Sequence, residues 1–309
     1  MNIYSNLDEI GLSFETGSVV TLGNFDGVHI AHRKLLEKLL EQSNFLHLPA
    51  ILVTYYPNPS IVLGKNKDLK YIYTEEKKKE ILKSIGLKNL IVIPFTRELS
   101  EISAYTFIKD ILYNKLKAKH IILGFNHFFG KNREGDIDFL ANHTEEFSYT
   151  VSKIDPVYAD GEKISSSYMR SLILEGEVEK LKTLLVEPFS IKGTVMHGDK
   201  RGRTIGFPTA NLSIDEAQMI PGNGVYAGYV KVENIKYKAM VNIGIRPTFN
   251  GTTKTIEVNI LDFTGDLYDK ILEFIFFKKI RNEMKFSNID ELKIQLESDR
   301  STTSQYLDL

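Results

Sequence analysis

Cysteine is absent from the 309 residues of this chain. Its absence excludes a disulfide framework, a thiolate zinc site and a cysteine nucleophile. The first twenty residues carry Asp8, Glu9 and Glu15 and lack a basic start followed by an apolar block, so we expect no secretory signal. Together these features predict a cytoplasmic location.

The chain also lacks an excess of charge of either sign and a long apolar run. With a net charge of −1 and a pI of about 6.7, it has no overall electrostatic attraction for nucleic acid or anionic membrane. The most apolar stretch near the end, residues 271–277, is far too short to span a bilayer. We therefore expect no nucleic-acid partner, no membrane role, and a monomer or weak homo-oligomer.

What is present predicts a two-domain α/β chain. A length of 309 residues is long for one core, while 42% apolar and 26% charged residues are typical of a globular protein. Strand-like runs alternate with helix-like segments in the first half, which predicts a doubly wound parallel sheet covered on both faces. The strand-like runs are residues 18–22, 50–55, 90–93 and 120–123.

The second half has a different pattern. From residue 190 to 280, β-favouring segments separated by turn residues predict an antiparallel barrel or sandwich, and Ser287 is expected to cap a closing helix that runs to about Ser298. Before this change, residues 164–185 indicate two helices broken at Gly176. We place the boundary near residue 187, giving domains at 1–186 and 187–309.

The first candidate site is the run TLGNFDGVHIAH at residues 21–32, where the first strand gives way to the first helix. Gly23 and Gly27 allow close backbone approach, and unpaired amides at the helix start suit phosphate. His29 and His32 can point to the same side and hold phosphate oxygens. They could equally be surface residues or zinc ligands, although no third ligand lies at a suitable spacing.

A second element, KISSSYMR at residues 163–170, strengthens the functional interpretation. Its serines can cap a helix start, and Arg170 one turn later can bind polyphosphate through its fork of N–H groups. An ordinary serine cap with a surface arginine would have the same pattern. Between the two elements, GFNHFFG at residues 124–130 supplies Asn126 as a polar contact, while its aromatic residues could belong to the core.

The second candidate site is a glycine-punctuated basic loop suited to phosphates. Its nucleotide-binding candidates are Gly193, Gly198, Lys200, Gly202 and Gly206. Thr209 and Asn211, two residues apart in an extended segment, could share one Mg²⁺. Glu257, in an alternating strand, could accept a proton from an attacking hydroxyl. A solvated strand residue and an ordinary turn are the plain alternatives.

Taken together, these motifs resemble the bifunctional bacterial riboflavin kinase/FAD synthetase family over nearly the whole chain. The matching runs, in order, are TLGNFDGVHIAH, ISSSYMR, HGDKRGRTIGFPTAN, PGNGVYAGYV and IEVNILDF. The resemblance implies an N-terminal FMN adenylyltransferase domain of the nucleotidyltransferase type and a C-terminal kinase domain with a six-stranded barrel. It also implies that ATP phosphorylates riboflavin to FMN, and that FMN then takes AMP from a second ATP to give FAD and pyrophosphate.

The resemblance also implies roles for individual residues. In the first domain, His29 and His32 would stabilise the ATP phosphates; the other implied contacts there are Asn24, Phe25, Asp26, Asn126, Ser165, Ser166 and Arg170. In the kinase, Thr209 and Asn211 would hold Mg²⁺ and Glu257 would be the base. Arg281 resembles the basic residue beside the flavin end of that site.

Five positions depart from the family pattern: Ala31, Asn58, His127, Ser167 and Asn259. Ala31 stands where the family usually has glycine, and a requirement for positive φ there would cost roughly 1 kcal/mol or more. We hypothesise that adenylyl transfer is retained but weaker than the kinase, so that Ala31→Gly raises FAD formation.

Two other interpretations stay open. The chain could have only one of the two activities, or it could be a flavin-sensing regulator that keeps the folds without turnover. The regulator would be indicated by loss of Glu257, Thr209 or Asn211, and all three are present.

Overall fold

The computed structural model describes residues 1–197, 202, 205–233, 235–248 and 251–308. Contacts divide the chain into two compact units. The first unit comprises Met1–Leu69 and Glu75–Ser165, and the second comprises Lys70–Thr74 and Ser166–Leu309. Residues 166–186 therefore group with the second unit, and the boundary near residue 187 stays a prediction.

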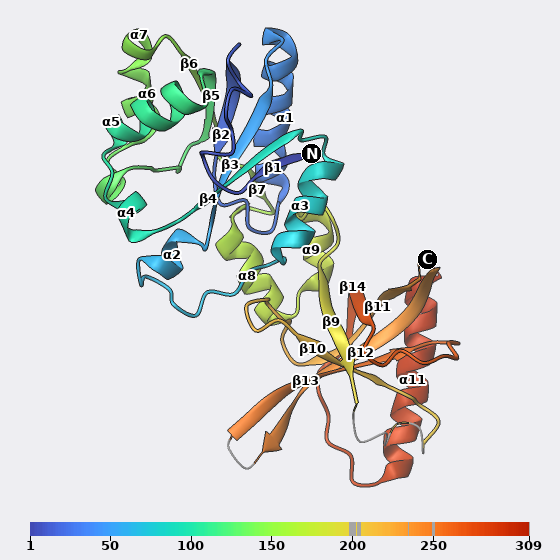
Figure 1. Ribbon diagram of the computed structural model, residues 1–309. Coiled ribbons are helices and arrows are strands. Elements are labelled where there is room, and N and C mark those ends of the chain that lie inside the picture. The colour runs from blue at the N-terminus through green and yellow to red at the C-terminus, as the bar shows by residue number, and fades with distance from the viewer. Residues whose placement is uncertain (198–201, 203–204, 234, 249–250, 309) are drawn as a thin grey trace. The chain divides into compact units, whose positions relative to one another are not determined.

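The first unit is built on a six-stranded parallel sheet of order β1-β4-β3-β2-β5-β6 (Figure 1). Its strands are β1 (Asn2–Tyr4), β2 (Ser18–Leu22), β3 (Ala50–Tyr56), β4 (Asn89–Pro94), β5 (Ala118–Gly124) and β6 (Thr150–Ile154). Every residue of β2 is buried, as expected of a strand covered on both faces. A small antiparallel pair, β7 (Tyr158–Ala159) and β8 (Glu162–Lys163), follows the sheet.

Helices cover both faces of this sheet. The helix α1 (Ile30–Leu46) buries Leu35, Leu36 and Leu39 against β2, β3 and β5, while α5 to α7 lie on the other side (Figure 1). The remaining helical segments are α2 (Pro59–Val62), α3 (Glu75–Ser84), α4 (Arg97–Ser100), α5 (Ala104–Thr106), the π-helical η1 (Phe107–Lys115), the 3₁₀ turn η2 (Lys131–Arg133), α6 (Ile137–Ala141) and α7 (Thr144–Phe147). The predicted doubly wound architecture is confirmed.

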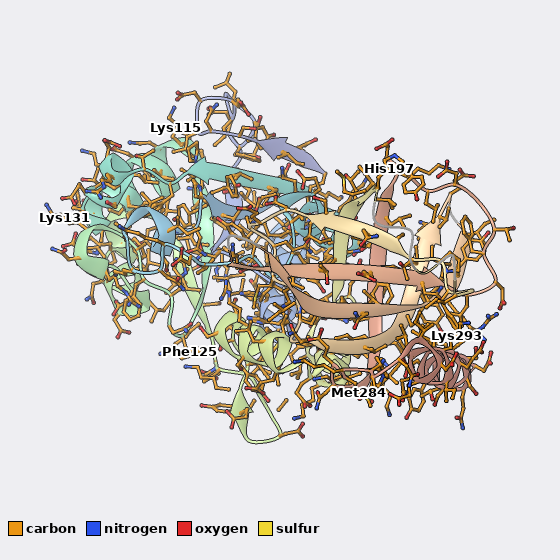
Figure 2. All side chains as sticks on the ribbon, turned by 90° about the horizontal axis from the view of Figure 1, so that it is seen from below. Lys115, Phe125, Lys131, His197, Met284 and Lys293 are labelled. Carbon is orange, nitrogen blue, oxygen red and sulfur yellow. The ribbon has the colours of Figure 1, made fainter. Side chains whose placement is uncertain are left out.

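The second unit is a closed antiparallel barrel of order β10-β13-β12-β11-β14-β9. Its strands are β9 (Ser190–Met196), β10 (Ala210–Ile214), β11 (Gly224–Val232), β12 (Ile235–Thr248), β13 (Gly251–Ile260) and β14 (Ile271–Arg281). Before the barrel come α8 (Ser166–Glu175) and α9 (Val178–Leu184), separated at Gly176, whose φ is +79°. His197 and Met284, labelled in Figure 2, belong to this unit. The six-stranded barrel of the prediction is confirmed.

The closing helix differs in its limits from the prediction. The helix α11 runs from Ile289 to Leu307, and Asn288 rather than Ser287 is its N-cap. Asn288 Oδ1 accepts a hydrogen bond from the Glu291 amide over 2.9 Å, and Glu291 Oε2 accepts one from the Ser287 amide over 3.0 Å. The Asn288 side chain thus caps the helix one residue later than predicted, and Glu291 binds the amide of the residue that precedes the cap.

Candidate active sites

The sheet order of the first unit brings two polar loops together. The strands β2 and β5 are neighbours, and the chain winds away from them in opposite directions, which makes this pair the topological switch point. Ligands bind beyond the carboxyl ends of strands at such a point. The loop after β2 carries Asn24 and the loop after β5 carries Asn126, and both line one cavity of about 530 Å³.

The two histidines of the first motif lie face to face at the start of α1. His29 is the N-cap, and its Nδ1 accepts a hydrogen bond from the His32 amide over 3.3 Å. Their ring centroids are 3.7 Å apart with an interplanar angle of 11°, and the Phe25 ring stacks on His32 at 4.6 Å. The structure therefore brings Phe25, His29 and His32 into one stack beside the first amides of the helix.

Burial keeps both imidazoles neutral. It lowers the pKa of His29, which is 3% exposed, from 6.5 to about 4. Burial, followed by the proximity of His29 and Lys78, holds the pKa of His32 well below 6.5. Because His29 Nδ1 is an acceptor, its proton lies on Nε2, and the ring can donate a hydrogen bond to a phosphate oxygen.

Sequence reasoning missed Lys78. This lysine of α3 is only 4% exposed, and its Nζ pairs with Glu75 Oε1 at 2.6 Å. A cation so near the histidines adds positive potential to a site predicted for phosphates. The available signal was a lysine on the apolar side of an amphipathic helix, hidden within the basic run at residues 77–79.

The strained part of the first loop is not at Ala31. Ala31 lies within α1 and has no positive φ, whereas Phe25 and Val28 have φ values of +50° and +35°. The positive φ that would have made Ala31 costly is therefore absent, because its position is helical, and the expected gain in FAD formation on Ala31→Gly stays a prediction. Gly23 is needed for another reason, since a Cβ there would lie 2.8 Å from the Phe25 ring.

The other predicted residues of the first motifs fall in both units. Asp26 is buried, and Ser165 belongs to the first unit, while Ser166 and Arg170 belong to the second. In the second unit Arg170 Nε donates a hydrogen bond to the Lys70 carbonyl over 3.1 Å. The polyphosphate role of Ser165, Ser166 and Arg170 stays a prediction.

Asn58, one of the departures, has a structural role in the first unit. It is the N-cap of α2, and its Oδ1 accepts a hydrogen bond from the Ser60 amide over 2.9 Å. Ser60 also lines the cavity of about 530 Å³. The side-chain amide of Asn58 therefore stabilises a helix start at the cavity wall.

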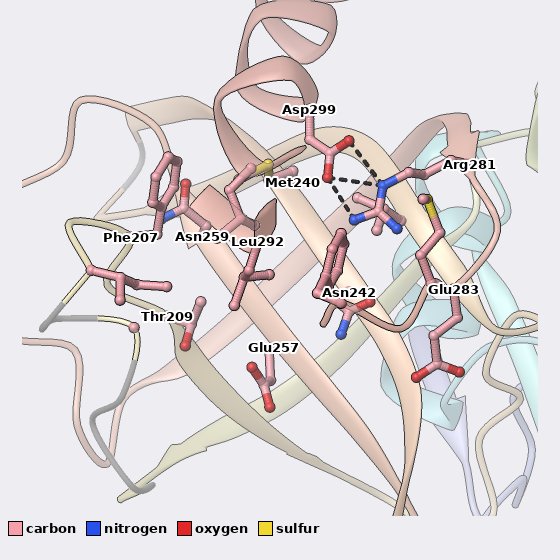
Figure 3. A pocket seen from close by; sticks show the side chains of 16 residues that line it. Phe207, Thr209, Met240, Asn242, Glu257, Asn259, Arg281, Glu283, Leu292 and Asp299 are labelled. Atoms are coloured by element: carbon pink, nitrogen blue, oxygen red, sulfur yellow. Dashed lines mark hydrogen bonds and ion pairs between the residues drawn. The ribbon is translucent and has the colours of Figure 1, made fainter. Parts of the chain in front are cut away.

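The second site forms inside one end of the barrel. Asn211 of β10 and Asn242 of β12 are the cross-strand partners of Glu257 on β13, so the three side chains share one face of the sheet. Glu257, Asn242 and Thr209 line a cavity of about 240 Å³ (Figure 3). Within the described part of the chain, the Glu257 carboxylate has no hydrogen-bond partner. Thr209 also lines a neighbouring cavity of about 80 Å³.

The glycines of the second motif have different roles. A Cβ at Gly202 would lie 2.2 Å from the Phe207 carbonyl oxygen, so this glycine allows the loop to pack on the segment that leads to Thr209. Gly206 has φ +87°. A Cβ at Gly193 would lie 2.5 Å from the Ser213 carbonyl, which gives Gly193 a role in pairing β9 with β10. Gly198 and Lys200 lie outside the described residues.

Arg281 lines the cavity of about 240 Å³, and its guanidinium is paired with the carboxylate of Asp299. Its Nε contacts both carboxylate oxygens of Asp299 at 3.0 and 3.1 Å, and its Nη2 contacts Asp299 Oδ2 at 2.8 Å (Figure 3). Gln295 Nε2 donates to the same carboxylate over 2.9 Å. The pair links β14 to α11, and sequence reasoning, which predicted only a flavin contact for Arg281, missed this link.

Two searches of the described residues were negative. No cluster of three or more histidine, aspartate or glutamate side chains able to hold a metal ion occurs among them. No described helix combines the length and the apolar character needed to cross a membrane.

Comparison with known proteins divides the chain into two segments. The FAD synthetase family model matches residues 12–168, and the riboflavin kinase family model matches residues 185–307. The bifunctional riboflavin kinase/FMN adenylyltransferases of Listeria monocytogenes and Escherichia coli K12 are 37% and 34% identical to the chain. The first alignment covers 94% of this chain and 93% of the relative, and the second covers 100% and 99%.

A solved structure agrees over the full length as well. A crystal structure described as a macrolide-efflux protein from Streptococcus pneumoniae superposes with a TM-score of 0.90 at 33% identity, covering 98% of each chain. Fold and relatives define a transferase built of two units. More particularly, the chain belongs to the bifunctional riboflavin kinase/FMN adenylyltransferase family.

Proposed function

We propose that this chain makes FAD from riboflavin in two ATP-dependent steps, phosphorylation in the barrel unit and adenylyl transfer in the parallel-sheet unit. ATP, riboflavin and FMN are then its small-molecule partners. The main support is that each of the two segments matched by a family model has its own cavity, with predicted site residues in its wall. The cavity of the first segment has a volume of about 530 Å³ and is lined by Asn24 and Asn126. The cavity of the second has a volume of about 240 Å³ and is lined by Thr209 and Glu257.

In the barrel, Glu257 is the general base. Its carboxylate accepts the proton of the riboflavin 5′-hydroxyl while that oxygen bonds to the γ-phosphorus of ATP. The bond between the γ-phosphorus and the β–γ bridging oxygen breaks, and ADP leaves. Thr209 lines both cavities at this end of the barrel, which supports a phosphoryl group passing beside it.

Mg²⁺ fits the donor set on this face of the barrel. Thr209 and Asn211 offer a hydroxyl and an amide oxygen, and Asn211 pairs across the strands with the carboxylate-bearing Glu257. Magnesium takes few protein oxygens and completes its shell with phosphate and water. When bound, it neutralises charge on the transferred phosphate. Asn211 and Thr209 would hold it, and Glu257 would remain the proton acceptor.

In the first unit, a phosphate oxygen of FMN bonds to the α-phosphorus of ATP, and the bond to the α–β bridging oxygen breaks to release pyrophosphate. His29 donates from Nε2 to the phosphates as a neutral group, and the free amides at the start of α1 add further donors. Such donors stabilise charge that develops in the transition state.

The test is to incubate the full chain with riboflavin, ATP and Mg²⁺ and to separate the flavins over time. FAD formation supports both steps. If FMN is the final product and added FMN is not converted, the chain has only the kinase activity. If added FMN is converted but riboflavin is not, the chain has only the adenylyltransferase activity. No product at all would indicate the flavin-sensing regulator.

A further inference from the structure

Glu283 is a carboxylate in the wall of the barrel cavity that the proposed phosphoryl transfer does not use. It follows β14, its side chain is exposed, and it lines the cavity of about 240 Å³ together with Asn242. Its Oε2 accepts a hydrogen bond from Asn223 Nδ2 over 3.2 Å. Among the residues that the structure describes, none donates a hydrogen bond to Glu283 Oε1. One oxygen is therefore anchored, and the other is available as an acceptor.

Gly244 on β12 makes room for this carboxylate. A Cβ at Gly244 would lie 2.3 Å from Glu283 Oε1 and 3.7 Å from Asn242 Nδ2. Gly244 has no positive φ, so the close approach of Glu283, and not the backbone conformation, is what requires a residue without a side chain there. The free oxygen of Glu283 and the amide of Asn242 therefore lie next to each other over the same stretch of β12.

The polar groups of the cavity form a row that begins at the proposed base. Asn242 is the cross-strand partner of Glu257, and Figure 3 shows its side chain between those of Glu257 and Glu283. Apolar side chains, among them Met240 and Leu292, line other parts of the same cavity. A wall with an apolar part and a row of polar groups suits a ligand that joins an aromatic ring to a hydroxylated chain.

The chemistry of the row favours neutral hydroxyl groups as its partners. An ionised carboxylate only accepts hydrogen bonds, and those from hydroxyl donors to it are stronger than hydrogen bonds between neutral groups. The amide of Asn242 can both donate and accept. The negative charge of Glu283 would repel a phosphate, so this end of the row suits the acceptor alcohol better than ATP.

We propose that Glu283, together with Asn242, determines the specificity of the kinase unit for its acceptor by binding the secondary hydroxyls of the ribityl chain. Asn223 is then a positioning residue, because it holds the other oxygen of Glu283. The inference rests on the proposed phosphorylation of riboflavin and deepens it. A flavin whose side chain lacks the secondary hydroxyls would leave the carboxylate and the amide without partners, and would therefore react less efficiently.

The test compares two acceptors in the full chain: riboflavin, and an analogue whose unbranched pentyl side chain ends in a single hydroxyl. Wild type should prefer riboflavin by about 100-fold or more in kcat/KM. In Glu283→Ala this preference should fall about tenfold through a higher KM for riboflavin, while kcat/KM for the analogue stays within about threefold. Asn223→Ala keeps the carboxylate but removes its anchor, so the preference should fall only about two- to fivefold.

A matched control is Glu233→Ala, which removes an exposed carboxylate of the same unit that is paired with Lys270 Nζ at 3.0 Å and lies outside the cavity wall. It should leave the preference for riboflavin unchanged. An equal loss for both flavins in Glu283→Ala, or no preference in wild type, would contradict the inference. If Glu283→Ala does not fold, Asn223→Ala decides by the same ratio, and an unchanged ratio there overturns the inference. Absence of riboflavin phosphorylation by the wild-type chain would instead contradict the proposed function.

Discussion

Asn259 holds the segment that carries the proposed metal-binding residues: its Nδ2 donates a hydrogen bond to the Pro208 carbonyl oxygen over 2.7 Å. Asn259 is buried on β13, and Pro208 directly precedes Thr209. This chain therefore anchors the segment with a side-chain amide. Thr209 and Asn211 therefore depend for their position on a side chain from a different strand.

Replacing Asn259 should weaken metal use by the kinase. In Asn259→Ala the Pro208 carbonyl loses its partner, and a net hydrogen bond of about 1 kcal/mol corresponds to a rise of about fivefold in KM for Mg²⁺·ATP. Initial rates of FMN formation at varied Mg²⁺·ATP measure this. Adenylyl transfer to added FMN is the internal control and should not change. A KM equal to that of wild type would show that the segment holds its position without Asn259.

Glu257→Gln should separate the two activities. Without a general base, kcat for riboflavin phosphorylation is expected to fall by about 10²- to 10⁴-fold. Because the other reaction uses a different unit, FAD formation from supplied FMN should continue at the wild-type rate. Both rates can be followed by separating flavins from one preparation. A variant that still phosphorylates riboflavin within a few-fold of wild type would remove Glu257 from the role of base.

His29 combines a cap and a proposed phosphate donor, and two substitutions distinguish them. His29→Asn keeps a side-chain oxygen for the His32 amide but lacks the Nε2–H group, whereas His29→Ala loses both. Adenylyl transfer should fall about 100-fold or more in each, and only His29→Ala should also lose about 1 kcal/mol of stability. Full activity of His29→Asn would mean that the ring acts only as a cap.

The Arg281–Asp299 pair should contribute to stability far more than an exposed pair on the same helix. Their side chains are 16% and 1% exposed, so Asp299→Ala leaves a nearly buried guanidinium and should cost about 3 to 5 kcal/mol in urea unfolding. The control is Arg300→Ala, which breaks the exposed contact with Asp262 and should cost about 0.5 kcal/mol or less. An equal loss of unfolding free energy in the two variants would contradict the larger contribution of the Arg281–Asp299 pair.

The buried histidines predict a loss of stability in mild acid. His29 and His127 have pKa values of about 4 in the folded protein against 6.5 as the ordinary value. Between these limits the unfolded chain binds more protons, so stability is full above pH 6.5 and falls as the pH drops toward 4. The thermal midpoint should be lower at pH 5 than at pH 7.5. His127→Phe should reduce the difference between the thermal midpoints at pH 5 and pH 7.5. The same dependence of the midpoint on pH in variant and wild type would contradict a contribution from His127.

Local sequence patterns predicted the main helices and strands but not the edge strands of the sheet. Buried runs such as residues 50–55, which are apolar or aromatic except for Thr54, identified β3 directly. The edge strands β1 and β6 were not predicted, because each is short and only partly buried. The closing helix was predicted too short, since even the buried face of its last turns contains polar residues, Asp299 and Thr303, which break the apolar periodicity.

The amino-acid sequence by itself determined the two motifs, the metal and base candidates at Thr209, Asn211 and Glu257, and the fold class, because each depends on residues close together in the chain. Only the tertiary structure decided which side chains these residues meet: Asn242 lies beside Glu257, Asn259 is hydrogen-bonded to Pro208, and Lys78 lies near His32. These relationships join different strands and helices, and strand register and helix packing, which no local pattern contains, bring them together.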